Sequence, residues 1–253
     1  GAGAGQGRRG REAARQVARQ GAGGDTGRAV IQLEGLLTGF TLTGGNGKSL
    51  AHQKLAATAV GAPPIEDPLP LVPEAAVRVI ATLLGGKPPP PVRIGFPRNH
   101  VQVEVGDTTL LARLAEGRFM EWRPFLDRFP KPTGSVVLPC GVLKNAVAAA
   151  AIAVDDATRR LELTFVADSI HPAEGVMVLS SLSSRGKADV QEAVEWQGED
   201  VQVSFDPQYV QNMLEALGDA TPVKLALFPG NIPLKLTTLD GFLGMSQLMG
   251  GTQ

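Results

Sequence analysis

Apolar and polar residues alternate in the stretch PVRIGFPRNHVQVEV, residues 91–105, on both sides of a turn-like Pro-Arg-Asn. A period of two is typical of a half-buried β-strand, so the stretch predicts a strand, a turn and a second strand. A similar stretch, PVKLALFPGNIPLKLTT, recurs about 131 residues further along the chain, at residues 222–238. We expect a second strand pair there.

Each strand pair follows a segment with helical periodicity. Before the first pair, Pro73 suits a first helical turn, apolar residues recur at positions 77, 80, 83 and 84, and two glycines end the pattern at residues 85–86. Before the second pair, Asp206 suits an N-cap and Pro207 the first helical position, and an apolar stripe follows at positions 210, 213, 214 and 217. Both segments predict amphipathic helices.

The two halves of the chain also open alike. Residues 11–20 and 138–154 are rich in strong helix formers. Strand-like segments follow them, at residues 28–35 and 37–45 in the first half and at residues 159–167, 174–182 and 189–196 in the second. Each half therefore reads helix, strands, helix, strands. This order predicts an α+β fold of two duplicated domains, each with two helices packed on antiparallel sheets.

The stretch RFPKPTGS, residues 128–135, interrupts both kinds of periodicity with two prolines and a glycine. We place the domain boundary near Pro132. The prediction is a flexible Gly/Arg-rich start at residues 1–9, a first domain at residues 10–132 and a second domain at residues 133–253.

Composition narrows the functional classes. The net charge of -1 and the pI near 6.4 exclude a uniformly basic nucleic-acid coat, so contact with a polyanion would need a local patch. The single cysteine, Cys140, excludes an internal disulfide and favours a cytoplasmic location. No run of about 18 apolar residues is present. The chain begins at Gly1 rather than Met, which leaves open whether a further domain precedes it.

Motifs of enzymes are weak in this chain. Gly47, Lys48 and Ser49 copy the end of a phosphate-binding loop, but the glycine that should begin the loop is Leu42. The three histidines are scattered singly, without the spacing of metal ligands, and no G-x-S-x-G elbow is present. We therefore expect a protein that is not an enzyme, with no catalytic residue, cofactor or metal.

The segment VGDTTLLARLAEGRFMEWRPFL, residues 105–126, resembles the end of the middle domain of the bacterial sliding clamp, the DNA polymerase III beta subunit. That family usually has GRFPDY followed by basic residues. This chain has Gly117, Arg118 and Phe119, with Met120 in place of the proline.

Residues 195–227 look like the last domain of the same family, in which an aromatic residue and a run of leucine and alanine follow a strand. Tyr209, Leu214, Ala216 and Leu217 match that pattern, and the Asp-Pro pair at 206–207 departs from it. The resemblance covers most of residues 10–248 and implies domains two and three of a divergent clamp.

The resemblance implies a DNA polymerase processivity factor that encircles duplex DNA and tethers the replicative polymerase. In such clamps helices line the lumen, where basic residues contact phosphates without reading bases. The residues that would contact double-stranded DNA here are Arg11, Arg15, Arg19, Arg78 and Lys144. Residues 189–206 contain six acidic residues and no basic one, which fits an outer face that repels DNA.

In this family the polymerase and the clamp loader insert a short apolar peptide into a pocket between domains two and three. The family motif TDGHRLA aligns with GNGKSLA at residues 45–51. Flexible apolar side chains suit such a groove, although the same residues are equally suited to closing a core. The residues that the resemblance assigns to partner-peptide binding are Gly47, Lys48, Leu50, Met120, Phe125, Phe242, Gly244 and Met245.

A ring of this kind needs about six such domains, so the chain would form a homo-trimer if it is complete and a homo-dimer if an upstream domain is missing. The sequence does not choose between them. The alternative function is a degenerate clamp-like module that binds peptides and forms no ring.

Overall fold

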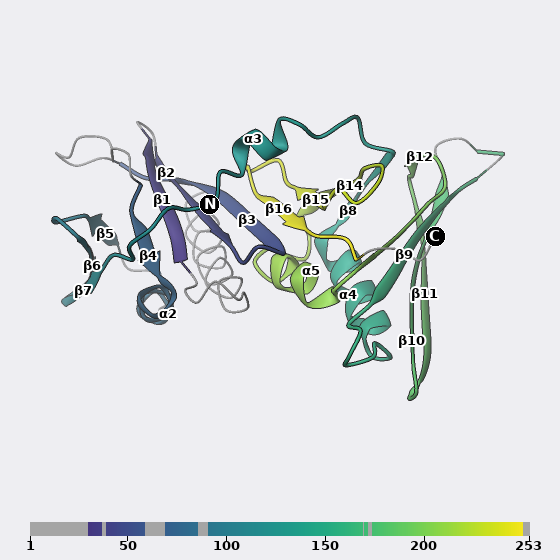
Figure 1. Ribbon diagram of the computed structural model, residues 1–253, viewed down its shortest axis with the longest axis horizontal. Coiled ribbons are helices and arrows are strands. Elements are labelled where there is room, and N and C mark those ends of the chain that lie inside the picture. The colour runs from purple at the N-terminus through teal and green to yellow at the C-terminus, as the bar shows by residue number, and fades with distance from the viewer. Residues whose placement is uncertain are drawn as a thin grey trace. The chain divides into compact units, whose positions relative to one another are not determined.

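The computed structural model describes residues 30–36, 39–58, 69–85, 91–168, 170–171 and 174–249. The chain forms two compact units, Gly1–Met120 and Glu121–Gln253, each with its own sheets and helices (Figure 1). The predicted flexible start and the predicted helix at residues 11–20 lie outside the described residues. None of the described helices is long and apolar enough to cross a membrane.

The first unit contains an antiparallel sheet with the strand order β4-β1-β2-β3. Alternate apolar side chains of the first strand, Ile31 and Leu33, are buried, as the period-two pattern requires. The sheet continues through a tight hairpin between the second and third strands. The strands are β1 (Val30–Leu36), β2 (Gly39–Gly45), β3 (Ser49–Ala56) and β4 (Leu71–Pro73).

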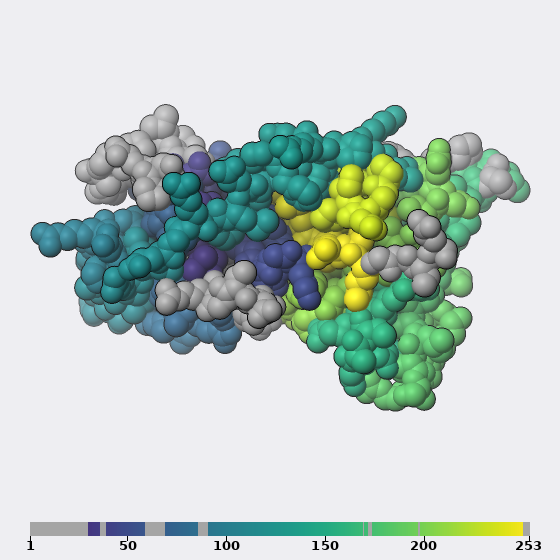
Figure 2. Space-filling model, in the orientation of Figure 1, coloured from purple at the N-terminus to yellow at the C-terminus, as the bar shows by residue number. Residues whose placement is uncertain are grey.

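The helix α2 (Glu74–Leu83) follows β4 directly and buries Ala76, Val77 and Ala81. Pro73 is its N-cap rather than a residue of its first turn, because Pro73 still pairs with β1 as the last residue of β4. A small second sheet follows, with the order β5-β6-β7, and forms exposed surface at the left of Figure 2. Its strands are β5 (Val92–Gly95), β6 (His100–Val105) and β7 (Thr108–Arg113).

The second unit contains two antiparallel sheets, with the orders β12-β8-β14-β15-β16 and β11-β10-β9-β13. The helix α4 (Cys140–Ala151) packs beside α5 (Pro207–Leu214) and against β10 and β11, and a short helix α3 (Arg123–Leu126) precedes β8. The strands are β8 (Gly134–Pro139), β9 (Leu161–Ala167), β10 (Gly175–Ser183), β11 (Gly186–Val194), β12 (Gln197–Gly198), β13 (Val201–Phe205), β14 (Pro222–Leu227), β15 (Leu234–Thr237) and β16 (Leu243–Ser246).

Trp196 is buried in the core of the second unit, where it contacts residues of several strands. Its ring stacks on Phe165 with 4.1 Å between the ring centroids, and its indole N–H donates to the carbonyl of Glu199. The backbone of Gly134 lies so close that a Cβ atom there would come within 2.2 Å of the indole ring. Glycine is therefore required at this position by the close approach of the ring to the backbone.

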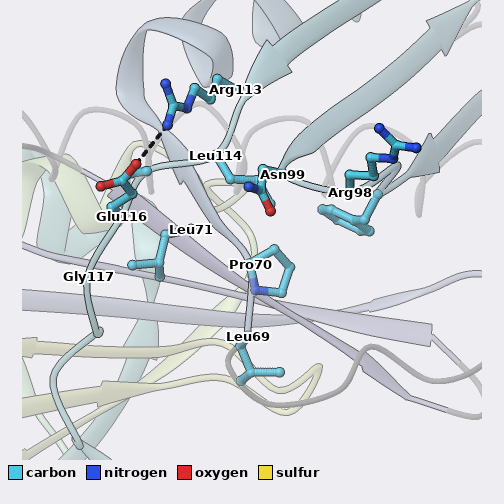
Figure 3. Close-up of a pocket in the computed structure, with 11 residues that line it drawn as sticks. Leu69, Pro70, Leu71, Arg98, Asn99, Arg113, Leu114, Glu116 and Gly117 are labelled. Atoms are coloured by element: carbon cyan, nitrogen blue, oxygen red, sulfur yellow. Dashed lines mark hydrogen bonds and ion pairs between the residues drawn. The ribbon is translucent and has the colours of Figure 1, made fainter.

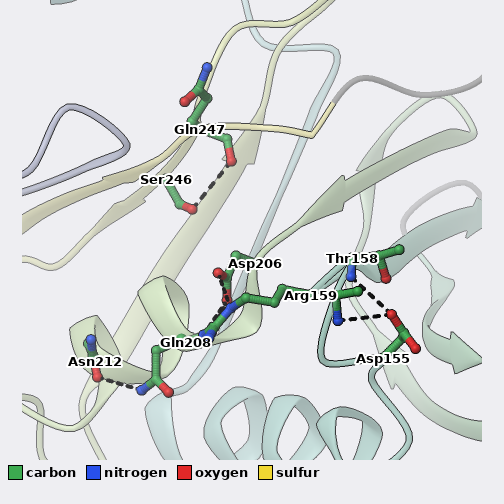
Figure 4. Close-up of polar contacts among 9 residues, drawn as sticks. Asp155, Thr158, Arg159, Asp206, Gln208, Asn212, Ser246 and Gln247 are labelled. Atoms are coloured by element: carbon green, nitrogen blue, oxygen red, sulfur yellow. Dashed lines mark hydrogen bonds and ion pairs between the residues drawn. The ribbon is translucent and has the colours of Figure 1, made fainter. Parts of the chain in front are cut away.

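Asp206 joins α5 to the segment that precedes β9 (Figure 4). Its carboxylate accepts a hydrogen bond from the backbone N–H of Gln208 at 2.9 Å, which is the predicted N-cap contact. It also accepts from Arg159, whose Nε lies 2.8 Å from Oδ2. This ion pair and its hydrogen bonds raise the pKa of Arg159 further above its ordinary value.

The α+β fold is confirmed, with antiparallel sheets and few helices, and the strand pairs predicted at residues 91–105 and 222–238 are present. The boundary between the two compact units falls between Met120 and Glu121 of the chain, whereas the sequence analysis predicted it near Pro132. Residues 121–133 pack on the second unit through Phe129, whose ring lies edge-on to Phe228 with 4.8 Å between the centroids.

Candidate functional site

The two described residues that were predicted to contact DNA are both exposed cations on helices. Arg78 lies on α2, with 65% of its side chain exposed, and forms an ion pair with Glu74 one turn earlier. Lys144 lies on α4, with 37% of its side chain exposed, and its Nζ is 3.5 Å from Asp219. Exposed ion pairs of this kind are weak, so both cations stay available to a phosphate. Arg11, Arg15 and Arg19 lie outside the described residues.

The surface formed by α4 and α5 is almost neutral. Lys144 is the one charged residue within α4, and α5 contains no charged residue. The exposed residues of α4 include Asn145, Ala148 and Ala149, and the exposed Gln208 on α5 donates a hydrogen bond to Asn212. Short, neutral side chains give a surface that adds little electrostatic affinity for a polyanion.

The acidic stretch at residues 189–206 does not form one uniform outer face. Asp206 is buried, with 8% exposed, and serves the cap and the ion pair described above. The sequence interpretation was wrong for this residue, because a count of charges carries no information on burial. Asp189 remains exposed on β11, where a hydrogen bond from Lys187 is the main cause that lowers its pKa.

The turn that resembles a phosphate-binding loop connects two strands. Gly47 adopts a positive φ of 79° between β2 and β3, and Asn46 Oδ1 accepts from the backbone N–H groups of Lys48 and Ser49 at 3.0 and 2.8 Å. A phosphate-binding loop instead leads into a helix whose N-terminus faces the phosphates. The turn between β2 and β3 therefore lacks the helix of a phosphate-binding loop, and Lys48 is exposed there.

Several residues assigned to partner-peptide binding are core residues in their own units. Leu50 is 3% exposed in the first unit, and Phe242 and Met245 are 1% and 5% exposed in the second. Gly244 is also buried, and a Cβ atom there would come within 2.6 Å of the sulfur of Met213. These four positions fit the interpretation that they close a core.

Met120 and Phe125 differ from that group, because they are 50% and 43% exposed. The Phe125 ring lies edge-on to Phe129, which continues to Phe228, and Lys235 Nζ lies 5.3 Å from the centroid of the Phe228 ring. This aromatic row was not found from the sequence, since Phe129 and Phe228 are nearly 100 residues apart and lie in segments without regular periodicity.

The first unit also contains a cavity of about 380 Å³ beside the turn between β5 and β6. Leu69, Pro70 and Leu71 form part of its wall, and Asn99 points toward Pro70 (Figure 3). Arg113 forms an ion pair with Glu116 at 2.8 Å on the rim. This cavity could not be predicted from the sequence, because its wall comes from three separate segments of the chain.

The loop between β9 and β10 contains a cluster that was not predicted from the sequence. The atoms of Asp168, His171 and Glu174 that could bind a metal lie within 4.8 Å of one another. The Asp168 carboxylate accepts hydrogen bonds from the backbone N–H groups of Ile170 and His171, and these are the first causes that lower its pKa. All three side chains are exposed, and exposed acidic groups are common without an ion. The cluster supports no metal assignment.

Comparison with known proteins shows what the chain resembles. No protein-family model matches it. The beta sliding clamp of Proteus mirabilis is 27% identical over 157 residues, which are 62% of this chain and 40% of the relative. The beta sliding clamp of Escherichia coli K12 is 29% identical over 164 residues, which are 63% of this chain and 42% of the relative.

Solved structures agree over nearly the whole chain. The DNA polymerase III subunit beta from Pseudomonas aeruginosa matches with a TM-score of 0.80 and 18% identity, over 96% of this chain and 64% of that one. The chain is similar to the bacterial sliding clamps in sequence and has their fold. A putative beta subunit from Eubacterium rectale has this clamp fold at a TM-score of 0.81 and 17% identity, over 94% of this chain and 62% of that one. The chain spans about 40% of the length of the curated clamps it matches.

Proposed function

We propose that this protein is a DNA polymerase processivity factor, a sliding clamp that encircles duplex DNA and tethers the replicative polymerase without catalysing a reaction. The observation that carries the proposal is the clamp fold, which extends over 96% of the chain at a TM-score of 0.80. The curated relatives, all named beta sliding clamps, support it independently by sequence.

The helices carry few charges, which fits a protein that stays on DNA because its ring is closed and not because it binds phosphates tightly. A protein that neutralises Z phosphates loses affinity with salt at a slope of about 0.9Z in a double-logarithmic plot. Arg78 and Lys144 give two such contacts, and the exposed surfaces of α4 and α5 are otherwise neutral. Weak phosphate contacts of this kind allow a closed ring to slide. Arg11, Arg15 and Arg19 would add three contacts if they share this role.

The ring itself would be built from copies of the chain. Within the described part of the chain, β7 and β11 each end a sheet and have no strand on their outer side. Pairing of β7 of one copy with β11 of the next would close three copies into six domains. The two edges also carry opposite charges, Glu192 on β11 and Arg113 on β7, while Lys187 and Asp189 of β11 pair with each other at 2.7 Å. An upstream domain in the natural protein would make the ring a dimer.

The polymerase and the clamp loader would bind through short apolar peptides. A P. aeruginosa clamp with a TM-score of 0.79 to this chain has been solved bound to griselimycin, so a related fold binds a ligand. On this chain, Met120, Phe125 and Lys48 are the exposed members of the proposed partner site. The buried members, Leu50 and Met245 among them, are core residues of their own units.

The test is retention on DNA that has no free end. The protein is assembled on nicked circular DNA with a clamp loader and passed through a sizing column at moderate salt, and the DNA is then linearised. A clamp stays on the circle and runs off the linear form. Reversal of charge by Arg78→Glu and Lys144→Glu should lower retention at low salt with no change in melting temperature. Equal retention on circular and linear DNA would exclude encirclement and favour the alternative peptide-binding module.

A further inference from the structure

The outer edge of β5 differs from its counterpart in the second unit. The sequences PVRIG and PVKLA begin at Pro91 and at Pro222 and occupy β5 and β14. In β14 the two apolar side chains, Val223 and Leu225, are 0% and 2% exposed. In β5 the equivalent Val92 and Ile94 are 37% and 38% exposed, and all four residues of the strand are classed as exposed.

The inner edges of the two strands are paired identically, so the difference does not arise there. Ile94 pairs with Val103 as Leu225 pairs with Leu236, and Gly95 pairs with Gln102 as Ala226 pairs with Lys235. The pair β5–β6 therefore repeats the register of β14–β15, and the order β5-β6-β7 repeats the order β14-β15-β16.

The outer edges account for the difference. β8 pairs antiparallel with the outer edge of β14, where Val136 faces Leu225 and Leu138 faces Val223. Both β8 side chains are buried, at 1% and 5% exposed. Among the described residues, no strand pairs with the outer edge of β5. Val92 and Ile94 are exposed because no strand among the described residues covers this edge.

The residues just before the predicted helix at 11–20 do not have the composition of a strand. β8 leads directly into α4, so its counterpart in the first half would directly precede the predicted helix at residues 11–20. That stretch is GAGAGQGRRG, which contains five glycines and no β-branched, aromatic or large apolar residue. Such a composition has low strand propensity and supplies no side chains equivalent to Val136 and Leu138.

We propose that the outer edge of β5 is a docking site for an extended peptide strand of a partner protein, bound antiparallel by strand addition. Main-chain hydrogen bonds would hold the peptide, and two apolar residues at alternate positions would cover Val92 and Ile94. This inference is independent of ring formation and goes beyond the proposed clamp function.

The charge on β5 specifies the residue between those two apolar positions. Arg93 lies on the opposite face of the sheet from Ile94, its side chain is 87% exposed, and its nearest carboxylate is Glu104, at 4.0 Å. In the second unit the equivalent Lys224 faces Val137 of β8. A peptide with an acidic residue at that position would place its carboxylate opposite Arg93, which is a favourable cross-strand pair. The ligand is therefore an apolar-acidic-apolar strand.

The first experiment compares three blocked peptides by NMR titration of the isotope-labelled chain. Gly-Ser-Val-Glu-Leu-Pro follows the β8 sequence with glutamate in the middle, a second peptide has lysine there, and a third has serine at both apolar positions. We expect shifts at the amides of Arg93 and Gly95 with the first peptide, binding weaker by about threefold with the second, and no shift with the third. Equal shifts from all three, or none from the first at millimolar concentration, would overturn the proposal.

Two variants test whether the peptide binds at the outer edge of β5. Ile94→Lys should abolish binding, and the matched control Leu111→Lys on β7, where Leu111 is 57% exposed, should leave it unchanged. The reverse outcome would assign the peptide to β7 and refute the proposal. If Ile94→Lys instead lowers the native mass of the peptide-free protein, the occupant of the edge is a second copy and not a partner peptide.

A cross-link tests the register even if Ile94→Lys fails to fold. A Cβ atom at Gly95 would meet no atom within 4 Å, so Gly95→Cys is tolerated, and the native Cys140 is buried. Ser135 of β8 faces Ala226, the equivalent of Gly95. A peptide with an activated cysteine at the serine position should therefore form a disulfide with Gly95→Cys much faster than a peptide with the cysteine moved by one residue. Equal rates would contradict the antiparallel register.

Discussion

Replacement of Asp206 tests how the helix α5 is fixed to the second unit. The carboxylate caps α5 through Gln208 and accepts hydrogen bonds from Arg159. Loss of an N-cap side chain costs about 1 kcal/mol. The ion pair contributes about a further 1 kcal/mol, a figure kept low because 53% of the Arg159 side chain is exposed and solvent screens the pair. Asp206→Ala should therefore lower the free energy of unfolding by about 2 kcal/mol.

Asp206→Asn separates the two contributions. Asparagine is as good an N-cap as aspartate but carries no charge, so this variant should lose about 1 kcal/mol, the ion-pair part alone. Both tryptophans, Trp122 and Trp196, lie in the second unit, so their fluorescence during urea unfolding reports on this unit. Asp156→Asn is the matched control, because Asp156 pairs with Arg185 at 3.1 Å with 91% of its side chain exposed.

The order of stability should be wild type and control, then Asp206→Asn, then Asp206→Ala. Equal losses in the two Asp206 variants would mean that the capping hydrogen bond contributes nothing. A loss in Asp206→Ala no larger than in the control would refute the reasoning altogether. High salt should shrink the difference between the wild type and Asp206→Asn, because salt screens the ion pair.

Two further predictions concern the core of the second unit. Gly134→Ala should lower the free energy of unfolding by about 3 kcal/mol, measured as a lower urea midpoint, since the new methyl group overlaps the Trp196 ring; an unchanged midpoint would show that the ring can move aside. Burial raises the pKa of the Cys140 thiol from its ordinary value of 9.0 to about 11, so alkylation at pH 8 should be slow until the unit unfolds. Because the folded state favours the protonated thiol, Cys140 contributes fully to the stability of the folded protein below pH 9, and this contribution is lost as the pH rises toward 11. The variant Cys140→Ala should lack this loss of stability at alkaline pH. An identical loss in both proteins would exclude Cys140 as its cause.

The local elements could be predicted because their signals are local. Alternation at residues 91–105 gave β5 and β6, and the Asp-Pro pair at 206–207 gave the start of α5. The site residues were harder to predict. Leu50 and Met245 were named for their flexible apolar character, which is shared by residues of a groove and residues of a core, and only the packed structure shows that both are buried.

The sequence by itself determined the duplicated α+β organisation, since periodicity, caps and the repeat of PVRIG as PVKLA are all properties of neighbouring residues. Only the tertiary structure decided whether the apolar side chains of each copy of the repeat are buried or exposed. Val92 and Val223 have similar neighbours in sequence, yet β8 covers Val223 and no described strand covers Val92. Burial depends on contacts between segments that are distant in the chain, and for that reason one motif forms a closed core in the second unit and an open edge in the first.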